Sequence, residues 1–428
     1  MLSIMSKSNA TIPSVRIVKL LRVAVGVAAG AWLDRVLHRS GFDAMLARRV
    51  RRAFEVLGPT FVKAGQLLSC SSSPLPKVWA DEMALCRDHV TSVPWPAVER
   101  LLQEELGDRY ILLTDIDPVP LAAGSMAQVH VAHLADGTEV VVKVQRPGLG
   151  RVVADDMRLL KLAARLAMRF SATCVAANAT ALVDDFARGL EEQLSFKQEA
   201  ANVVTMQQAL GATPVRVPAI YRDLSSERVL VMERLHGVAA DDVAAIDSLG
   251  IDRDAVVREV VSALLLPALT RGVFHADMHP GNMLILADGR LGLLDFGVIG
   301  RMDGAAREAA SELLAALADR RLADVVIAML KVVDVASTDL VALLPDVQSL
   351  VVGCLDKPIA DVDVREVITT VLSLASRHGF ALPESLVALL KQMVYISGMC
   401  QQLDPTFDVL GDLGPIVRLA RASDAVAA

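Results

Sequence analysis

Two short polar motifs separated by a β-hairpin signal constrain this chain more than any other feature of its sequence. The first runs from His275 to Asn282 with the letters HADMHPGN, and the second is Asp295-Phe296-Gly297. The apolar residues between them flank Asp288-Gly289, and an Asp-Gly pair in that setting is a strong hairpin signal. Either motif alone would more often be a strand-end turn or a pair of core histidines. In this order, separated by one hairpin, they indicate a functional site.

The residue types in these motifs suit phosphoryl transfer. That chemistry needs an oriented nucleophile and metal ions that hold the phosphate charge. In the pattern HxDxxxxN followed by DFG, the first aspartate faces the acceptor, and the asparagine and second aspartate hold magnesium. Asp277, Asn282 and Asp295 fit these three roles. The sequence therefore predicts a kinase-like protein that binds ATP and Mg²⁺.

Residues on the N-terminal side of the motifs support a nucleotide site. Lys143 ends Val140-Val141-Val142-Lys143, which resembles the strand whose lysine pairs with the α- and β-phosphates. The turn Ala122-Ala123-Gly124-Ser125 stands where a kinase has its glycine-rich phosphate loop, although it lacks GxGxxG. The alternative for Lys143 is a solvated residue on an edge strand.

A strand lysine of this kind needs a helix glutamate to hold it, and Glu199 is the candidate. A solvated helix position is the better interpretation for Glu191 and Glu192, whereas Glu199 lies beside small residues. Met232 and Glu233 end a short apolar strand, and their backbone is a candidate adenine contact. An ordinary strand end remains the alternative there.

Periodicity predicts an α+β chain with four segments. Residues 1–52 form a basic amphipathic helical segment with a break near Ser40 and Gly41, residues 53–110 a helical extension, residues 111–235 a β-containing lobe with a helical insertion, and residues 236–428 a helical lobe. Hairpins are expected around Asp136-Gly137 and Asp288-Gly289. The remaining expected elements are helices over 97–106, 155–170, 181–211 and 254–271, a strand over 228–232, and several helices between 305 and 403.

The charge is distributed unevenly. Residues 1–52 hold ten Lys and Arg against Asp34 and Asp43, which makes this segment about +8 in a chain of net charge −7. The segment is therefore a candidate for contact with an anionic membrane surface. Its apolar run Val23–Leu33 is far shorter than the roughly 20 residues that span a bilayer, so no transmembrane helix is expected. A cytoplasmic protein, peripheral on the membrane at most, is predicted, and a secretory signal is the minority interpretation.

The five cysteines are scattered and show no CxxC or Cys/His ligand spacing. This pattern argues against a disulfide framework and against a zinc site, and it fits a reducing compartment. A nucleic-acid partner is not expected.

Seven motifs in family order give the chain, from about Leu57 to Asp408, a resemblance to the UbiB/ADCK family of atypical kinases. They are Leu57–Gln66 (LGPTFVKAGQ), Ser125–His130 (SMAQVH), Val142–Gly148 (VKVQRPG), Glu199–Asn202 (EAAN), His275–Asn282, Asp295–Gly297 and Leu403–Phe407 (LDPTF). The resemblance implies a bilobal protein-kinase-like fold, with a small β-containing N-lobe, a large helical C-lobe and an N-terminal helical extension.

Within that extension the KxGQ motif supplies Lys63 and Gln66. On sequence alone these could be plain helix-surface residues. The resemblance implies that they gate the active site where a protein kinase accepts its peptide, which disfavours protein phosphorylation. It further implies an ATPase-like activity that supports isoprenoid-quinone (ubiquinone-type) or lipid metabolism at membranes, with a quinone or its lipid precursors as partner.

Three positions depart from the family pattern. Gly124 stands where many relatives have alanine, Met278 replaces a common proline, and Ser195 replaces an acidic residue. The metal-binding and lysine positions are intact, so nucleotide binding is expected. Two other functions remain open: a nucleotide-switched scaffold for membrane biosynthetic enzymes, and a protein Ser/Thr kinase.

Overall fold

The computed structural model describes most of the chain in two compact units. The first unit comprises residues 1–198 and 221–232, and the second comprises residues 199–220 and 233–428. The described residues are 14–37, 41–68, 76–86, 92–170, 178–211, 213–319, 340–355, 383–405, 407 and 414–420, with 321, 324, 327, 328, 331, 370, 373, 374, 377 and 378. Ser40, Thr406 and Asp408, named above, lie outside them, as do the two cysteines Cys70 and Cys174.

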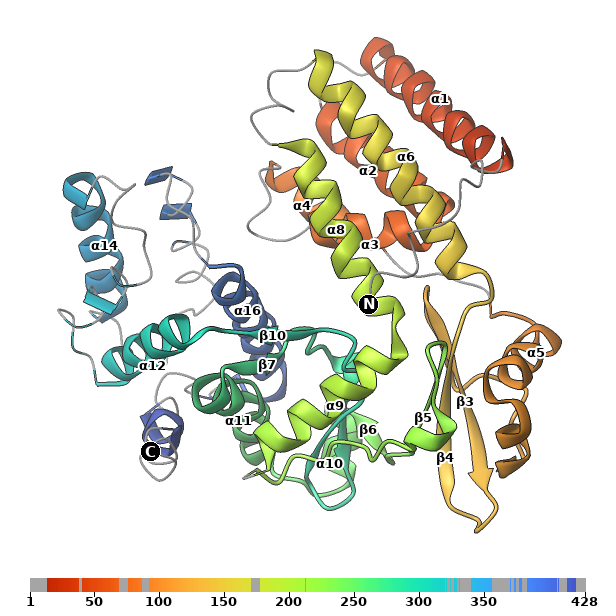
Figure 1. The fold of residues 1–428 in the computed structure, drawn as a ribbon. Helices are drawn as coiled ribbons and strands as arrows, with labels where there is room; N and C mark the ends of the chain where they lie inside the picture. The colour runs from red at the N-terminus through yellow and green to blue at the C-terminus, as the bar shows by residue number, and fades with distance from the viewer. Residues whose placement is uncertain are drawn as a thin grey trace. The chain divides into compact units, whose positions relative to one another are not determined.

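The first unit contains a five-stranded sheet with the order β1-β3-β4-β5, in which β2 also pairs with β3. The strands are β1 (Leu113–Thr114), β2 (Ala122–Ala123), β3 (Ala127–Leu134), β4 (Glu139–Gln145) and β5 (Val229–Glu233). The predicted hairpin around Asp136-Gly137 is confirmed: β3 and β4 pair antiparallel, and Gly137 supplies the left-handed φ of 84° that the turn needs. The helix α5 (Trp95–Leu106) lies against this sheet (Figure 1). Its Val98 and Leu102 share a hydrophobic core with Val140 and Val142.

The other described elements of the first unit are helices. Its helices are α1 (Ser14–Leu37), α2 (Phe42–Leu57), α3 (Pro59–Leu68), α4 (Lys77–Ala84), α6 (Leu149–Phe170) and α8 (Ala179–Leu194), with the 3₁₀ turns η1 (Gly107–Leu112) and η2 (Arg222–Leu224). The predicted break between α1 and α2 is confirmed at Gly41, whose φ of 77° is left-handed. Gly58, at a φ of 106°, separates α2 from α3.

One helix prediction is wrong. Residues 181–211 do not form a continuous helix, because Ser195 adopts an extended conformation between α8 and α9 (Phe196–Leu210). The Ser195 hydroxyl accepts a hydrogen bond from the Gln198 amide at 3.3 Å, which is the usual contact of a helix N-cap. The serine at this position therefore caps α9.

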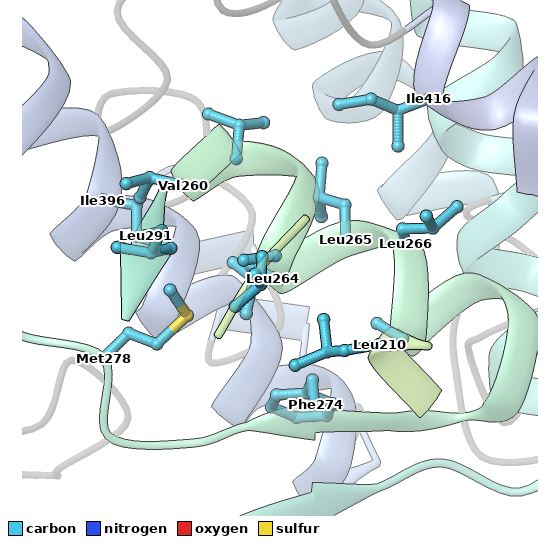
Figure 2. Close-up of a cluster of buried hydrophobic side chains, with 14 of the residues drawn as sticks. Leu210, Val260, Leu264, Leu265, Leu266, Phe274, Met278, Leu291, Ile396 and Ile416 are labelled. Atoms are coloured by element: carbon cyan, nitrogen blue, oxygen red, sulfur yellow. The ribbon is translucent and has the colours of Figure 1, made fainter. Parts of the chain in front are cut away.

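The second unit is built around α11 (Arg253–Arg271), whose residues 260–269 are almost all apolar and buried (Figure 2). Leu264 and Leu265 of this helix share a core with Leu210, Phe274 and Ile396. The elements that complete the unit are β6 (Gly237–Ala239), α10 (Val243–Ser248), β7 (Val273–His275), η3 (Pro280–Asn282), β8 (Met283–Leu286), β9 (Leu291–Leu293), β10 (Ile299–Arg301), α12 (Gly304–Ala318), α14 (Leu340–Leu355) and α16 (Glu384–Leu403).

Two small antiparallel sheets lie in the second unit, one with the order β6-β8-β9 and the other pairing β10 with β7. The second predicted hairpin, β8-β9 around Asp288-Gly289, is confirmed. The α+β class is also confirmed. The four predicted segment boundaries stay predictions. Within the residues that the structure describes, no helix is long and apolar enough to cross a membrane.

Candidate nucleotide and metal site

The two polar motifs are brought together by strand pairing in the second unit. Strand β7 ends at His275, and β10, which follows the DFG turn, pairs with it so that Ile299 lies opposite His275. At the open end of the β8-β9 hairpin, opposite its Asp288-Gly289 turn, the Leu294 amide donates to the Asn282 carbonyl at 3.0 Å. Asn282 and Asp295 therefore lie at one end of this hairpin, beside the loop that carries Asp277.

His275 joins the two motifs directly. It is fully buried, and its Nδ1 accepts a hydrogen bond from the Asp277 amide at 3.1 Å while its Nε2 donates to the Asp295 carbonyl. These contacts define the neutral tautomer, with the proton on Nε2. Burial lowers the pKa of His275, which favours that neutral form. His275 is thus a core histidine, as the alternative interpretation held, and also a link between the loop and the DFG turn.

Asn282 and Asp295 present oxygen atoms suited to magnesium. The Asn282 Nδ2 donates to the Asp277 carbonyl at 3.0 Å, so the ligand atom this amide can offer a metal is its Oδ1. The Asp295 Oδ1 accepts the Gly297 amide at 2.8 Å, which orients the carboxylate. Among the described residues no group of three or more His, Cys, Asp or Glu could hold a metal. Two oxygen ligands fit Mg²⁺, which keeps several waters and takes its other ligands from phosphates.

Two buried amides that sequence reasoning did not assign complete this arrangement. Gln392 of α16 accepts the Met278 amide at 2.8 Å and donates to the Ala276 carbonyl at 2.7 Å, so it binds the loop on both sides of Asp277. Asn202 of α9 donates to the Phe296 carbonyl at 2.9 Å, within the DFG turn. Asn202 belongs to a quoted motif, whereas the only signal for Gln392 is a polar residue inside an apolar helical run.

In the first unit, Lys143 lies on an interior strand. Strand β4 has β3 on one side and β5 on the other, so the alternative of a solvated edge lysine is wrong. The side chain is half-buried, and its Nζ lies 5.4 Å from the centre of the Phe196 ring. The adjacent Val142 and Val144 are fully buried.

Glu199 is buried, with 2% of its surface exposed, so the solvated interpretation is wrong for this residue. It is correct for Glu191 and Glu192, which are exposed on α8. A buried glutamate is rarely found without a paired charge or hydrogen bonds. The ion pair between Glu199 and Lys143 stays a prediction.

The predicted phosphate loop is a tight turn between β2 and β3. Ala122 and Ala123 are exposed and Ser125 is buried. The Gly124 amide donates to the Ala127 carbonyl at 2.8 Å, and the Gly124 carbonyl accepts from the Arg146 guanidinium at 2.8 Å. A Cβ at Gly124 would come no closer than 3.8 Å to its nearest neighbour, so the alanine of many relatives fits this backbone.

The predicted adenine contact has protein partners of its own. The Glu233 amide donates to the Ala219 carbonyl at 2.8 Å, and the Glu233 carboxylate accepts from Arg216 at 2.6 Å and from the Ala219 amide at 3.1 Å. Met232, the preceding residue, is buried. Glu233 therefore holds the segment before β5, and its amide is occupied within the chain.

Lys63 and Gln66 lie three residues apart on α3, and both are half-buried. Gly65 between them faces Cys86 and Phe54, where a Cβ would stand 2.6 Å from the Cys86 Sγ. Packing therefore favours glycine at this position of KxGQ. The gating role of Lys63 and Gln66 stays a prediction.

Comparison with known proteins matches two family models. The ABC1 atypical kinase-like domain matches residues 85–329, and the UbiB helical domain matches residues 347–408. The uncharacterized protein MT0675 of Mycobacterium tuberculosis is 32% identical over 91% of this chain and 83% of its own length. A probable protein kinase UbiB of Aeromonas salmonicida is 30% identical over 88% of this chain and 72% of its own length.

The fold has a counterpart among solved structures. A complex of Rv3197 with erythromycin from Mycobacterium tuberculosis aligns with a TM-score of 0.59 at 19% identity, over 91% of this chain and 95% of that one. The predicted kinase-like fold is confirmed by the ABC1 match and by this likeness. The chain therefore belongs to the UbiB family of ABC1 atypical kinase-like proteins.

Proposed function

We propose that this protein is a magnesium-dependent ATP-binding ATPase or phosphotransferase that supports isoprenoid-quinone or lipid metabolism. The observation that carries the proposal is the contact of His275 with both the Asp277 amide and the Asp295 carbonyl. This contact holds the acceptor-facing loop and the metal-binding turn in one arrangement. Membership of the UbiB family supports the quinone setting, because the resemblance to that family implies isoprenoid-quinone metabolism.

In this proposal the site residues bind the metal, bind the phosphates and orient the acceptor. Asn282 and Asp295 hold Mg²⁺ through side-chain oxygens, and the metal, when bound, neutralises charge on the phosphates. Lys143 pairs with the α- and β-phosphates and Glu199 holds the lysine. Asp277, whose side chain is exposed, orients the water or hydroxyl acceptor.

ATP binding is tested by thermal unfolding of the purified full chain with and without ATP and MgCl₂. Ligand at about 100 times its Kd should raise the Tm by roughly 5 °C. Asp295→Asn should lose the magnesium-dependent part of this shift and nearly all phosphate release. Asp288→Asn is the matched control, because Asp288 is an exposed carboxylate at the opposite end of the same hairpin. No shift in the wild-type protein, or equal shifts in all three proteins, would reject the proposal.

The metabolic role is tested by quinone and lipid profiles of cells that carry the wild-type protein or Asp295→Asn. A changed level of an isoprenoid quinone or a lipid precursor in the variant is expected. Identical profiles would reject the role in quinone or lipid metabolism but would not contradict ATP binding or hydrolysis.

Two other functions have distinct signatures. A scaffold switched by nucleotide would bind ATP with negligible turnover, even with lipids and partner enzymes present. The name of the UbiB relatives favours a protein kinase, which would transfer labelled phosphate to a protein acceptor and lose this activity in Asp277→Asn. The KxGQ segment, with Lys63 and Gln66 as gatekeepers, argues for the ATPase over the protein kinase.

A further inference from the structure

The outward face of α1 is apolar over the whole length of the helix. Its residues recur at intervals of three, four and seven, which places them along one side, and each has between 59% and 66% of its surface exposed. They are Val18, Leu21, Val25, Trp32 and Val36. Figure 1 shows α1 at the margin of the helices of the first unit, beside α2. A large exposed apolar patch on a folded protein marks a site of interaction with a protein, a membrane or a ligand.

The opposite side of α1 is anchored by two ion pairs, which determine the face that points outward. Arg16 binds Asp156 of α6 through two hydrogen bonds, the Nε–Oδ1 distance being 2.6 Å, and Asp156 is fully buried. Asp34 accepts from Arg49 of α2, with an Nη2–Oδ1 distance of 2.9 Å. Rotation of α1 to bury its outward face would leave the buried carboxylates of Asp156 and Asp34 without their partners, which is strongly unfavourable.

The exposed charges on α1 are all positive. Lys19, Arg22 and Arg35 are exposed and lie to either side of the apolar row, whereas Asp34, the one acidic residue of α1, is buried and paired. A second copy of this chain is a poor occupant, because the same three cations would face one another. An anionic surface with an apolar interior is complementary in both respects.

We propose that the outward face of α1 lies in the surface layer of an anionic lipid bilayer, with the helix parallel to the membrane. The apolar row enters the boundary between headgroups and acyl chains, and the flanking cations bind lipid phosphates. Trp32 suits this boundary, where tryptophan is enriched. Within the described residues no helix could span a bilayer, which agrees with surface attachment. The membrane is a partner of the proposed ATPase or phosphotransferase, and the biological setting of this inference rests on that proposed function. The binding of α1 to lipid needs no nucleotide.

The experiment is flotation of the full-length protein with vesicles of phosphatidylglycerol and phosphatidylcholine, compared with vesicles of phosphatidylcholine alone. The test variant is the double substitution Leu21→Asp and Val25→Asp. The matched control is Ile111→Asp with Leu182→Asp, which adds the same charge at exposed apolar positions of the same unit, outside α1. Circular dichroism and thermal unfolding of each protein verify that the fold is retained.

The wild-type protein and the control should float with the anionic vesicles, and the test variant should lose at least about tenfold in partitioning. Absence of wild-type flotation, or equal flotation of the test variant, would overturn the proposal. Flotation that is the same on neutral vesicles would overturn the role of the cations. A wild-type dimer that the test variant converts to a monomer, without vesicle binding, would assign the face to self-association. Vesicle flotation does not depend on nucleotide. A failure to bind ATP would therefore reject the proposed function without deciding whether α1 binds the membrane.

Discussion

Asp277 is positioned through backbone contacts. Its amide donates to His275, its carbonyl accepts from Asn282, and the peptide groups on either side of it are bonded to Gln392. Two of the three side chains that make these bonds, His275 and Gln392, are buried. These contacts hold the backbone from which the exposed Asp277 carboxylate projects.

Gln392→Met should loosen the loop around Asp277, because methionine has a similar volume but makes neither hydrogen bond. We expect faster hydrogen exchange in peptides that contain the Met278 amide. We also expect turnover, measured as phosphate release, to fall about tenfold with little change in KM, since positioning acts on the reacting geometry.

The matched control for this prediction is Gln401→Met, an exposed glutamine of the same helix. Unchanged exchange at Met278 in Gln392→Met would contradict the positioning role whether or not the protein hydrolyses ATP.

His275 should make stability sensitive to acid. Burial lowers its pKa below the ordinary value of 6.5, so the unfolded chain takes up the proton first as the pH falls. The stability contributed by neutral His275 is complete above about pH 6.5 and is lost below it, by up to about 1.4 kcal/mol per pH unit until the folded-state pKa is reached.

The pH effect can be measured from urea unfolding of the wild-type protein and His275→Gln at several pH values between about 5 and about 8. The variant should be less stable at neutral pH but should show a shallower loss in acid. Parallel curves for the two proteins would show that His275 does not titrate in this way.

Among the elements, α3 illustrates how a motif can combine packing and chemistry. Gly65 lets α3 approach Cys86 and Phe54, while Lys63 and Gln66 on either side of it remain half-buried. The cluster beneath includes Val62 and Met83. The close contact at Gly65 holds α3 against its neighbours, and this restricts the positions of Lys63 and Gln66.

Gly65→Ala should destabilise the protein by about 1–3 kcal/mol, because the new Cβ would stand 2.6 Å from the Cys86 Sγ and the neighbours must shift. Gly189→Ala is the control. Gly189 also lies inside a helix, nothing stands within 4 Å of its Cβ position, and alanine there should stabilise by about 0.5–1 kcal/mol. Chemical denaturation measures both changes. A result of the same sign for the two variants would contradict the packing argument.

For the whole molecule, the dominant electrostatic feature is the contrast between a basic first segment and an acidic remainder. The first 52 residues carry ten basic and two acidic side chains in a chain of net charge −7. A bilayer of anionic lipid attracts the first segment and repels the rest. Under the membrane proposal, such a distribution would orient the chain at a charged surface before any apolar contact forms.

Vesicle binding should therefore weaken when salt screens this attraction. Raising NaCl from about 50 mM to about 500 mM shortens the Debye length from about 14 Å to about 4 Å and should reduce binding to anionic vesicles about tenfold. Binding should persist in part, because the apolar row on α1 is not screened. Flotation at both salt concentrations measures the effect, and binding independent of salt would contradict the electrostatic part.

Much of the fold and part of the site could be predicted from local sequence. Both Asp-Gly hairpins, the helix α11 and the break at Gly41 follow from periodicity and turn chemistry, which act over a few residues. The helix over 181–211 failed at Ser195, because helical periodicity continues on both sides of a residue that caps the second helix. Gln392 could not be found, since its partners lie more than 100 residues away.

The sequence by itself determined the order and spacing of the motifs, the residue types that suit phosphate and magnesium, and the family. These depend on chemistry that is local in the chain. Only the tertiary structure decided that His275 links the loop to the DFG turn, that Lys143 lies on an interior strand and that Glu199 is buried. It also decided which face of α1 points outward. Burial and long-range hydrogen bonds depend on which distant elements pack together, and the local pattern of the sequence does not specify that packing.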